Sequence, residues 1–539
     1  MRIRKSFIII ITVLLSIFLL ASCNKKAEPA ATAPEKAAET TAETAGETSE
    51  EISAEPKKDT LVIALPSEPV TLHPSTAAER ITYLPVHAIH ETLVTENYTT
   101  GEIEPRLAES WEISEDGLKY TFKIRQGIKF HNGDPLTADD VVYTLNEISS
   151  KIVDVYGLIK NVTKVDENTV SFEMEYQFSP ILYLLSNTQS CIVDQEYYEK
   201  DPEGYGRNPN GTGPFKFKSW LSGENIVLER NEDYWRGPAP LASITFKVVP
   251  EEATKLIALE SGDIDAYIQA SLTNKPIVEE NSELKWIETS AGQVFTLAFN
   301  NGTHSDGTKS VFADNKALRE AIVFAIDKNE IVSLAIDDAA PPLYTPFPTF
   351  IQNYPANFEG NLYNVEKAKE KLIEAGYPDG FKFTMKTTSQ PIYAKPAEAI
   401  QGQLAKIGIE MELIQMERGT YLQEVYQNFD YDATIWAVSC DYPDMDSGAY
   451  KRFYSGNIAP GKNYMQINDP AMDEAIMINR SSQDPAEKAA QVLKVSEIIR
   501  DEVYALPLYA SPNTMAVRSD LKGVNINYGM MIDFYLWSR

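Results

Sequence analysis

The stretch from residue 381 to residue 439 constrains the fold of this chain more than any other. It alternates strand-like and helix-like segments, over residues 381–388, 395–408, 409–416, 420–428 and 431–439. Consecutive strands joined by single helices usually lie parallel in one sheet, with the helices covering its faces. We therefore predict an α/β fold here, and we expect any ligand near the carboxyl ends of the strands.

The first half of the chain predicts further strands and a helix with a defined start. Thr137 and Asp140 have the spacing of a capping box, directly before apolar residues at helical spacing. Residues 118–130 begin with alternating apolar and polar side chains, as in a strand with one buried face. Other strand candidates are residues 60–66, 169–175 and 225–231. The body of the chain is therefore predicted to be mixed α/β.

The N-terminus has the layout of a secretory signal peptide. Basic residues at positions 2, 4 and 5 precede an apolar run from Phe7 to Leu20. The run ends in Leu20-Ala21-Ser22-Cys23, which resembles the bacterial lipobox. That resemblance implies cleavage before Cys23 and attachment of lipid to its thiol. We therefore predict an extracytoplasmic protein that is lipid-anchored to the cell membrane.

The segment that follows Cys23 is predicted to be a disordered tether. Residues 24–58 are rich in Ala, Glu, Thr and Pro and contain no aromatic residue, so they cannot form a core. The whole chain carries 78 acidic and 49 basic residues, a formal charge of −29. This charge disfavours binding to nucleic acid and direct electrostatic docking on an anionic bilayer. No second apolar run approaches the roughly 20 residues that span a bilayer.

Several blocks of the sequence resemble the extracytoplasmic solute-binding proteins of ABC importers, in the branch that binds oligopeptides, dipeptides or nickel. The most specific block contains Trp111, an Asp-Gly turn at 116–117, Phe-His-Asn-Gly at 130–133 and Thr-Ala-Asp-Asp-Val at 137–141, in the family's order. Further matching blocks are residues 68–74, 210–220, 228–235, 255–266, 317–332 and 367–381. The resemblance covers essentially everything after the tether.

The resemblance implies a two-lobed clamshell of the type II periplasmic-binding-protein class, with an extra α/β subdomain inserted in the first lobe. The chain would cross between the lobes twice, at the predicted strands 295–301 and 505–511. Ligand would bind between the lobes, which close over it by a hinge movement. The predicted organisation is a lipoprotein signal peptide (1–22), a lipid-anchored tether (23–58), lobe I (59–80), the inserted subdomain (81–205), lobe I continued (206–298), lobe II (299–506) and a C-terminal return to lobe I (507–539).

Three carboxylates, Asp441, Asp444 and Asp446, directly follow the last predicted strand of the α/β stretch. A calcium EF-hand loop that starts at Asp444 fails, because Ala449 replaces the required Gly and Ser455 stands where Glu is needed. A glycosidase acid/base pair has no supporting substrate motif, and no hydrolase elbow, zinc-protease or phosphate-loop motif is present. We therefore predict no catalytic residue, no metal site and no cofactor. We expect Asp444 and Asp446 in a solvated loop or in a capping role.

Histidines and cysteines leave alternatives open. His87 and His90 could share one helix face, and the family's nickel-binding members make them candidates for metal binding. The simpler interpretation places them on a helix with one of them packed toward the core, and gives His131 a structural hydrogen-bonding role in a turn. Cys191 and Cys440 either pair or remain buried thiols, because two distant cysteines give no spacing signal.

In the peptide-binding branch of the family, the Asp that follows this strand pairs with the free α-amino group of the ligand. The resemblance assigns that role to Asp441, and a buried ammonium does require a fixed opposite charge. Peptides in this family are also held by main-chain hydrogen bonds along an extended ligand. The predicted ligand-binding residues are Asp441, Val70, Val438, Ser439, Cys440, Trp436 and Tyr442.

The sequence departs from the family pattern beside Asp441. Val438 stands where the family commonly has Trp, and Trp436 lies two residues earlier. Met445 replaces the usual Pro after Asp444. The alignment of Trp436 with the ligand pocket therefore stays open, and so does the stacking of a side chain on the ligand.

The sequence as a whole predicts a binding protein rather than an enzyme. It would capture short peptides in an interlobe cleft and deliver them to the transmembrane subunits of an ABC importer, acting as a monomer. The alternative is a non-peptide solute, such as an oligosaccharide, a nickel chelate or an opine-like compound. A secondary role as an adhesin or chaperone-like lipoprotein also remains open.

Overall fold

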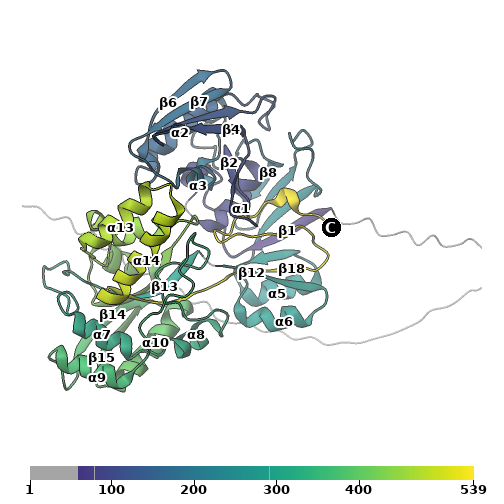
Figure 1. Ribbon diagram of the computed structural model, residues 1–539. Helices are drawn as coiled ribbons and strands as arrows, with labels where there is room; N and C mark the ends of the chain where they lie inside the picture. Colours follow the sequence, from purple (N-terminus) through teal and green to yellow (C-terminus); the bar gives the residue numbers. More distant parts are fainter. Residues whose placement is uncertain (1–58, 78, 291) are drawn as a thin grey trace, which may run out of the picture. The chain divides into compact units, whose positions relative to one another are not determined.

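The computed structural model describes residues 59–77, 79–290 and 292–539. The predicted signal peptide, Cys23 and the tether lie outside the described residues. Within the described residues the strands form four sheets, of seven, five, four and two strands (Figure 1). The prediction of a mixed α/β fold is confirmed.

The seven-stranded sheet gathers strands from both ends of the described chain, in the order β12-β18-β11-β1-β10-β9-β8. β1 pairs in parallel with β10 and β11, and the remaining pairs are antiparallel. β1 is apolar on both faces, because Leu61 and Ile63 pack in one core and Ala64 packs in another. The strands are β1 (Thr60–Leu65), β8 (Phe215–Leu221), β9 (Asn225–Arg230), β10 (Ser243–Val248), β11 (Ala266–Ile268), β12 (Leu284–Thr289) and β18 (Asn513–Arg518).

Helices α5 (Glu252–Ser261) and α6 (Lys275–Glu280) cover one face of this sheet, beside β12 and β18 (Figure 1). Gly262, in the left-handed conformation with φ +79°, ends α5. Helix α1 (Arg80–Ile89) packs its buried residues into the core on the opposite face. The seven-stranded sheet with these three helices is called lobe I below.

The five-stranded sheet has the order β15-β14-β16-β13-β17 and contains the predicted α/β stretch. β14 pairs in parallel with β15 and β16, as the alternation of strands and helices predicts. β13 is antiparallel to both of its neighbours. The strands are β13 (Gln293–Phe299), β14 (Lys382–Thr388), β15 (Glu410–Met416), β16 (Ala433–Ser439) and β17 (Ala505–Ala510).

Helices pack against both faces of the five-stranded sheet. The sheet and these helices together are called lobe II below. Ile435 of β16 belongs to one core and Val438 to the other, so both faces of this strand are covered. Figure 1 shows α7 to α10 below this sheet and α13 and α14 above it. The helices are α7 (Lys316–Phe324), α8 (Lys328–Ile336), α9 (Val365–Glu374), α10 (Pro391–Ala405), α11 (Arg418–Tyr421), α12 (Asp446–Phe453), α13 (Pro470–Ser481) and α14 (Pro485–Glu502).

The four-stranded sheet is antiparallel throughout, in the order β4-β5-β7-β6, and α2 packs against it (Figure 1). In β5 the side chains of Tyr120 and Phe122 are buried while Lys123 is exposed, which confirms the predicted alternation. The predicted capping box is also present, since Asp140 and Thr137 each accept a hydrogen bond from the other's main-chain N–H. We call this part the subdomain, with β2 (Val94–Glu96), β3 (Ile103–Pro105), β4 (Ala108–Ile113), β5 (Lys119–Ile124), β6 (Ile159–Asp166), β7 (Thr169–Met174), α2 (Ala138–Lys151), α3 (Ile181–Leu185) and α4 (Gln195–Lys200).

The chain passes between the two large sheets twice. β12 lies in the seven-stranded sheet and β13 in the five-stranded sheet, and β17 and β18 make the same change in the opposite direction. The strands that the sequence predicts at the crossings, 295–301 and 505–511, correspond to β13 and β17. Lobe I is therefore discontinuous along the chain.

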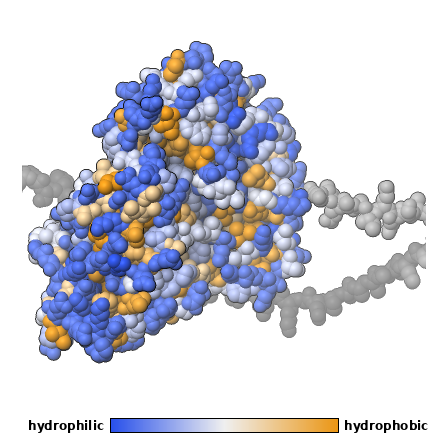
Figure 2. All heavy atoms as spheres, viewed as in Figure 1, coloured by the Kyte–Doolittle hydropathy of each residue, from blue (hydrophilic) through white to orange (hydrophobic). Residues whose placement is uncertain are grey.

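The exposed face, the two described cysteines and the helices were compared with the expectations from the sequence. The face seen in Figure 2 is mostly hydrophilic, with scattered hydrophobic patches. Cys191 and Cys440 are both free and buried. Among the helices of the described residues, none combines the length and the apolar character needed to cross a bilayer.

Candidate ligand-binding site

A cavity of about 390 Å³ lies between lobe II, the subdomain and the C-terminal segment. The subdomain contributes residues 152–156 and Leu158, from the segment that directly follows α2. Lobe II contributes the chain from Asp441 into α12, and the C-terminal segment contributes Asn527, Gly529 and Met531. The cavity therefore forms at the carboxyl end of β16, where the sequence predicts a ligand.

Asp441 lies on the wall of this cavity, two residues after β16 ends. Its side chain is 62% exposed, and its Oδ1 lies 2.9 Å from Nη2 of Arg80, the first residue of α1. The other terminal nitrogen of Arg80 donates to the carbonyl oxygen of Tyr528 at 3.0 Å. The main-chain N–H of Asp441 donates to the hydroxyl of Ser447. Asp441 is thus fixed from lobe I and from its own turn, while its carboxylate stays open to the cavity.

Asp444 and Asp446 differ from the expectation of a solvated loop, because both are buried. Asp446 Oδ1 lies 2.5 Å from Nη1 of Arg480, and Asp444 forms an ion pair with Lys488. Burial raises the pKa of Asp444, and the Lys488 ammonium opposes that change. Asp444 Oδ1 also accepts a hydrogen bond from the main-chain N–H of Asp446, the first residue of α12, although the residue in the N-cap position is Met445. Through these ion pairs, Asp446 and Asp444 connect the segment after β16 to α13 and α14.

The cations on α13 and α14 also reach the subdomain. Arg480 Nε donates to the Tyr176 hydroxyl at 3.0 Å, and the Arg480 carbonyl accepts from the Ser179 N–H at 3.0 Å. Lys488 Nζ donates to Ser179 Oγ at 2.6 Å. A further ion pair, between Lys462 and Asp154 at 2.7 Å, joins lobe II to the subdomain. These contacts close lobe II against the subdomain around the cavity.

The predicted ligand-binding residues are divided between the cavity wall and other positions. Asp441 and Tyr442 line the cavity. Val70 is exposed between β1 and the next helical turn and is not part of this wall. Val438 and Cys440 are buried in lobe II, and the Cys440 N–H already donates to the Gly292 carbonyl at 2.7 Å.

Trp436 and Ser439 also lie away from the cavity wall. Trp436 packs inside lobe II, where its ring stacks on Tyr393 and Tyr421 at centroid distances of 5.4 and 5.0 Å. Ser439 pairs with Gln293 in the ladder between β16 and β13. The aromatic wall of the cavity comes instead from Tyr83, Tyr156, Tyr176, Tyr442 and Tyr450.

Arg80 was not singled out by the sequence, although it holds the predicted anchor. It lies 361 residues from Asp441 in the chain, and no motif joins the two positions. A cation at the start of a helix is an ordinary surface feature until the fold brings a carboxylate to it. Lys451, which lines the cavity in the last turn of α12, was not singled out by the sequence either.

The histidines that the sequence singled out are engaged in structural hydrogen bonds. His87 Nε2 lies 2.9 Å from Thr188 Oγ1, and His90 Nε2 lies 3.0 Å from the Tyr205 hydroxyl. Burial lowers the pKa of both imidazoles to about 3. His131 Nε2 lies 2.9 Å from the Gly213 carbonyl oxygen, as expected for a structural turn. In the chain segments that the structure describes, no three His, Cys, Asp or Glu side chains are grouped to hold a metal ion.

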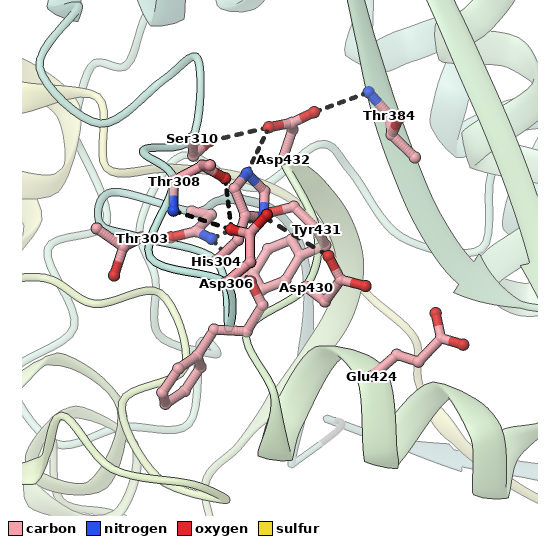
Figure 3. A network of polar contacts seen from close by, with 12 residues as sticks. Thr303, His304, Asp306, Thr308, Ser310, Thr384, Glu424, Asp430, Tyr431 and Asp432 are labelled. Carbon is pink, nitrogen blue, oxygen red and sulfur yellow. Dashed lines mark hydrogen bonds and ion pairs between the residues drawn. The ribbon is translucent and has the colours of Figure 1, made fainter.

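A second polar cluster, around His304, lies within lobe II (Figure 3). His304 Nε2 lies 3.3 Å from Asp432 Oδ1, and Asp430 Oδ1 is 3.8 Å from Nδ1. Asp432 also accepts from Ser310 Oγ at 3.2 Å and from the main-chain N–H of Thr384 in β14 at 3.0 Å. The serine bonds to the carboxylate and not to the imidazole, so this is not the Ser-His-Asp relay of a hydrolase. The cluster ties the loop after β13 to the sheet, and none of these residues lines the cavity.

Comparisons with known proteins identify the family. Residues 102–460 match the model of the bacterial extracellular solute-binding proteins, family 5 (middle region). The oligopeptide-binding protein AppA of Bacillus subtilis is 30% identical over 453 residues, which cover 77% of this chain and 80% of AppA.

Two solved structures extend the likeness to the fold. HbpA2 from Haemophilus parasuis has a TM-score of 0.80 at 26% identity, and the match covers 89% of this chain and 99% of HbpA2. The periplasmic binding protein DppA from Helicobacter pylori, in complex with the peptide STSA, has a TM-score of 0.76 at 28% identity, over 89% and 98% of the two chains. The chain therefore belongs to family 5 of the bacterial extracellular solute-binding proteins and has their two-lobed, type II clamshell fold.

Proposed function

We propose that this protein captures short peptides in the cavity beside Asp441 and delivers them to the transmembrane subunits of an ABC importer. One observation carries the proposal. Of the three acidic side chains after β16, Asp444 and Asp446 are buried in ion pairs, while Asp441 remains 62% exposed on the cavity wall. An open, rigidly held carboxylate is the group that a ligand's ammonium requires.

The contacts of Asp441 leave room for such a ligand. Arg80 approaches Oδ1, and in the described part of the chain no donor approaches Oδ2 within hydrogen-bond distance. A carboxylate can accept several hydrogen bonds, so an ammonium and Arg80 can share it. The names of two relatives also support a peptide, namely the oligopeptide-binding protein AppA and the DppA structure that contains a peptide.

Lipid on Cys23 would hold the protein outside the cytoplasm, and the predicted tether would let it reach the permease. The contacts of Arg480, Lys462 and Lys488 with the subdomain would belong to the closed form, which the permease recognises. The protein acts as a monomeric binding protein in this proposal, without a cofactor or catalysis. The remaining ligand-binding predictions (Val70, Val438, Ser439, Cys440 and Trp436) rest on the family resemblance alone.

Calorimetry with dipeptides and tripeptides on the mature protein tests the proposal. Asp441→Asn should weaken binding by about 10- to 100-fold, since a hydrogen bond to a charged group contributes about 1.5–3 kcal/mol. N-acetylation of the peptide should weaken binding to the native protein by a similar factor and should have little further effect on the variant. Asp139→Asn is the matched control, because Asp139 is also 62% exposed and paired with one cation, but lies outside the cavity.

Two results would overturn the proposal in different ways. N-acetylated peptides that bind as tightly as free peptides would remove the role of Asp441 as the ammonium anchor. Saturable stabilisation by an oligosaccharide, a nickel chelate or an opine-like compound, with none by peptides, would assign the cavity to a different solute.

A further inference from the structure

The two places where the chain passes between the lobes meet at one main-chain carbonyl group. Gly292 lies at the first crossing, directly before β13, and Asn513 lies at the second, as the first residue of β18. Asn513 Nδ2 donates to the carbonyl oxygen of Tyr528 at 2.7 Å. A Cβ atom at residue 292 would lie 2.9 Å from the same oxygen. Tyr528 belongs to the C-terminal segment, whose apolar residues pack in the core of lobe I.

Arg80 joins this point to the carboxylate of Asp441. Its Nη1 donates to the Tyr528 carbonyl oxygen at 3.0 Å, and its Nη2 lies 2.9 Å from Asp441 Oδ1. Arg80 and Tyr528 belong to lobe I, whereas Asp441 follows β16 of lobe II, so the ion pair spans the two lobes. The chain itself supplies every group of this bridge, which can therefore form before a ligand binds.

The bridge has room only because residue 292 has no side chain. A Cβ atom there would lie 2.9 Å from Arg80 Nη2 and 2.8 Å from the Cys440 carbonyl oxygen, in addition to its contact with Tyr528. Favourable contacts of a carbon atom are about 3.5–4.0 Å long. The Arg80 side chain can move, but the oxygens of Cys440 and Tyr528 belong to the main chains of opposite lobes. A methyl group at residue 292 would therefore hold the lobes apart at the hinge.

The side chain of Tyr528 makes a further contact between the lobes. Its ring stacks on Phe350, in the chain between α8 and α9, with 4.0 Å between the ring centroids and 6° between the planes. Asn527 and Gly529, on either side of Tyr528, line the cavity. The point where the hinge strands meet lobe I is thus also an edge of the candidate ligand-binding site.

We propose that Arg80 and Gly292 are positioning residues of a hinge latch, in which Arg80 holds the Asp441 carboxylate against lobe I and Gly292 lets the lobes approach closely enough. The latch holds the lobes closed without a ligand and keeps Asp441 in one orientation at the cavity wall. A ligand's ammonium then uses Oδ2 and does not have to close the lobes by itself. This last step rests on the proposed function, whereas the closing of the lobes does not.

Small-angle X-ray scattering without a ligand tests the latch. Gly292→Ala should have a larger radius of gyration than the native protein, and Arg80→Met should show a smaller increase. Asp441→Asn should match Arg80→Met, and the variant with both changes should open no further, because each change removes the same ion pair. Gly402→Ala is the matched control, since Gly402 lies in α10 and a Cβ atom there would meet no atom within 4 Å. It should keep the native radius.

Calorimetry with trialanine tests the consequence for ligand capture, because apparent affinity falls with the fraction of protein in the competent form. Gly292→Ala should raise the dissociation constant by about 10- to 100-fold, the range that corresponds to the cost of overpacking. Arg80→Met should raise it by about two- to fivefold, as expected for an ion pair with one exposed partner. Gly402→Ala should bind trialanine as the native protein does.

The possible failures are distinguishable. Equal radii of gyration for the native protein, Arg80→Met and Gly292→Ala would overturn the latch. Additive effects of Arg80→Met and Asp441→Asn would overturn the ion pair as its cause. Larger radii with unchanged trialanine affinity would overturn the part of the latch in ligand capture. Failure of the native protein to bind trialanine or any dipeptide would overturn the proposed function, and the scattering result would still decide the latch.

Discussion

The ion pair between Arg480 and Asp446 allows a quantitative prediction. The two side chains are only 4% and 3% exposed, with 2.5 Å between Nη1 and Oδ1. Arg480→Met removes the cation but leaves the Asp446 carboxylate buried, with the Tyr442 hydroxyl as its remaining side-chain donor at 2.8 Å. Removal of one partner from a buried ion pair costs about 3–5 kcal/mol. We expect the free energy of unfolding of Arg480→Met to fall by about that amount.

Urea unfolding of the ligand-free protein, followed by tryptophan fluorescence, measures this change. Arg500→Met is the matched control, because Arg500 pairs with Asp501 near the surface, with side chains 28% and 57% exposed. An exposed pair contributes about 0–1 kcal/mol, so the control should lose little stability. Equal losses in the two variants would refute the reasoning that burial sets the cost.

A second substitution identifies the origin of the cost. Adding Asp446→Asn to Arg480→Met removes the stranded charge and keeps an oxygen that can accept from Tyr442. The double variant should therefore recover part of the lost stability, and the coupling energy follows from the double-mutant cycle. A double variant that is less stable than Arg480→Met alone would show that lost packing, and not the unpaired carboxylate, is responsible.

Two further predictions concern other buried groups. Burial raises the pKa of Glu96 from its ordinary value of 4.5 to about 7, so its charge destabilises the fold above pH 7 and no longer does so below pH 4.5. Glu96→Gln keeps an acceptor for the Tyr528 hydroxyl. At pH 8 this substitution should raise the free energy of unfolding by about 3 kcal/mol, because it removes the buried charge. An equal gain at pH 4, where the native carboxyl is already neutral, would contradict this explanation. Trp436→Ala should cost about 3 kcal/mol of stability by emptying the stack with Tyr393 and Tyr421. Calorimetry should show peptide affinity within about twofold of the native value, and a larger loss would place Trp436 at the ligand.

Local patterns in the sequence predicted local structure well. The spacing of Thr137 and Asp140 predicted the start of α2, and the alternation from Tyr120 to Phe122 predicted β5. The order of strands and helices from residue 381 to 439 predicted the parallel pairs of β14 with β15 and β16. These features depend on neighbours in the chain, so the sequence contains the information that decides them.

The three carboxylates after β16 illustrate what spacing does not decide. They lie within six residues and looked alike as candidates, yet Asp444 and Asp446 are buried and Asp441 is open. The difference comes from Lys488 and Arg480, which α14 and α13 bring from more than thirty residues away. Whether a carboxylate is buried depends on such partners, because an unpaired buried charge is too costly to persist.

The sequence by itself determined the family and the α/β fold, and it predicted Asp441, at the end of a predicted strand, as the ligand anchor. Only the tertiary structure decided which charges meet. It brought Arg80 to Asp441 across 361 residues of chain, paired the other acids of the cavity wall, and left Lys451 without a counter-ion among the described residues. Secondary structure follows from local spacing, whereas the charge balance of a cavity is a sum over residues that only the folded chain brings together.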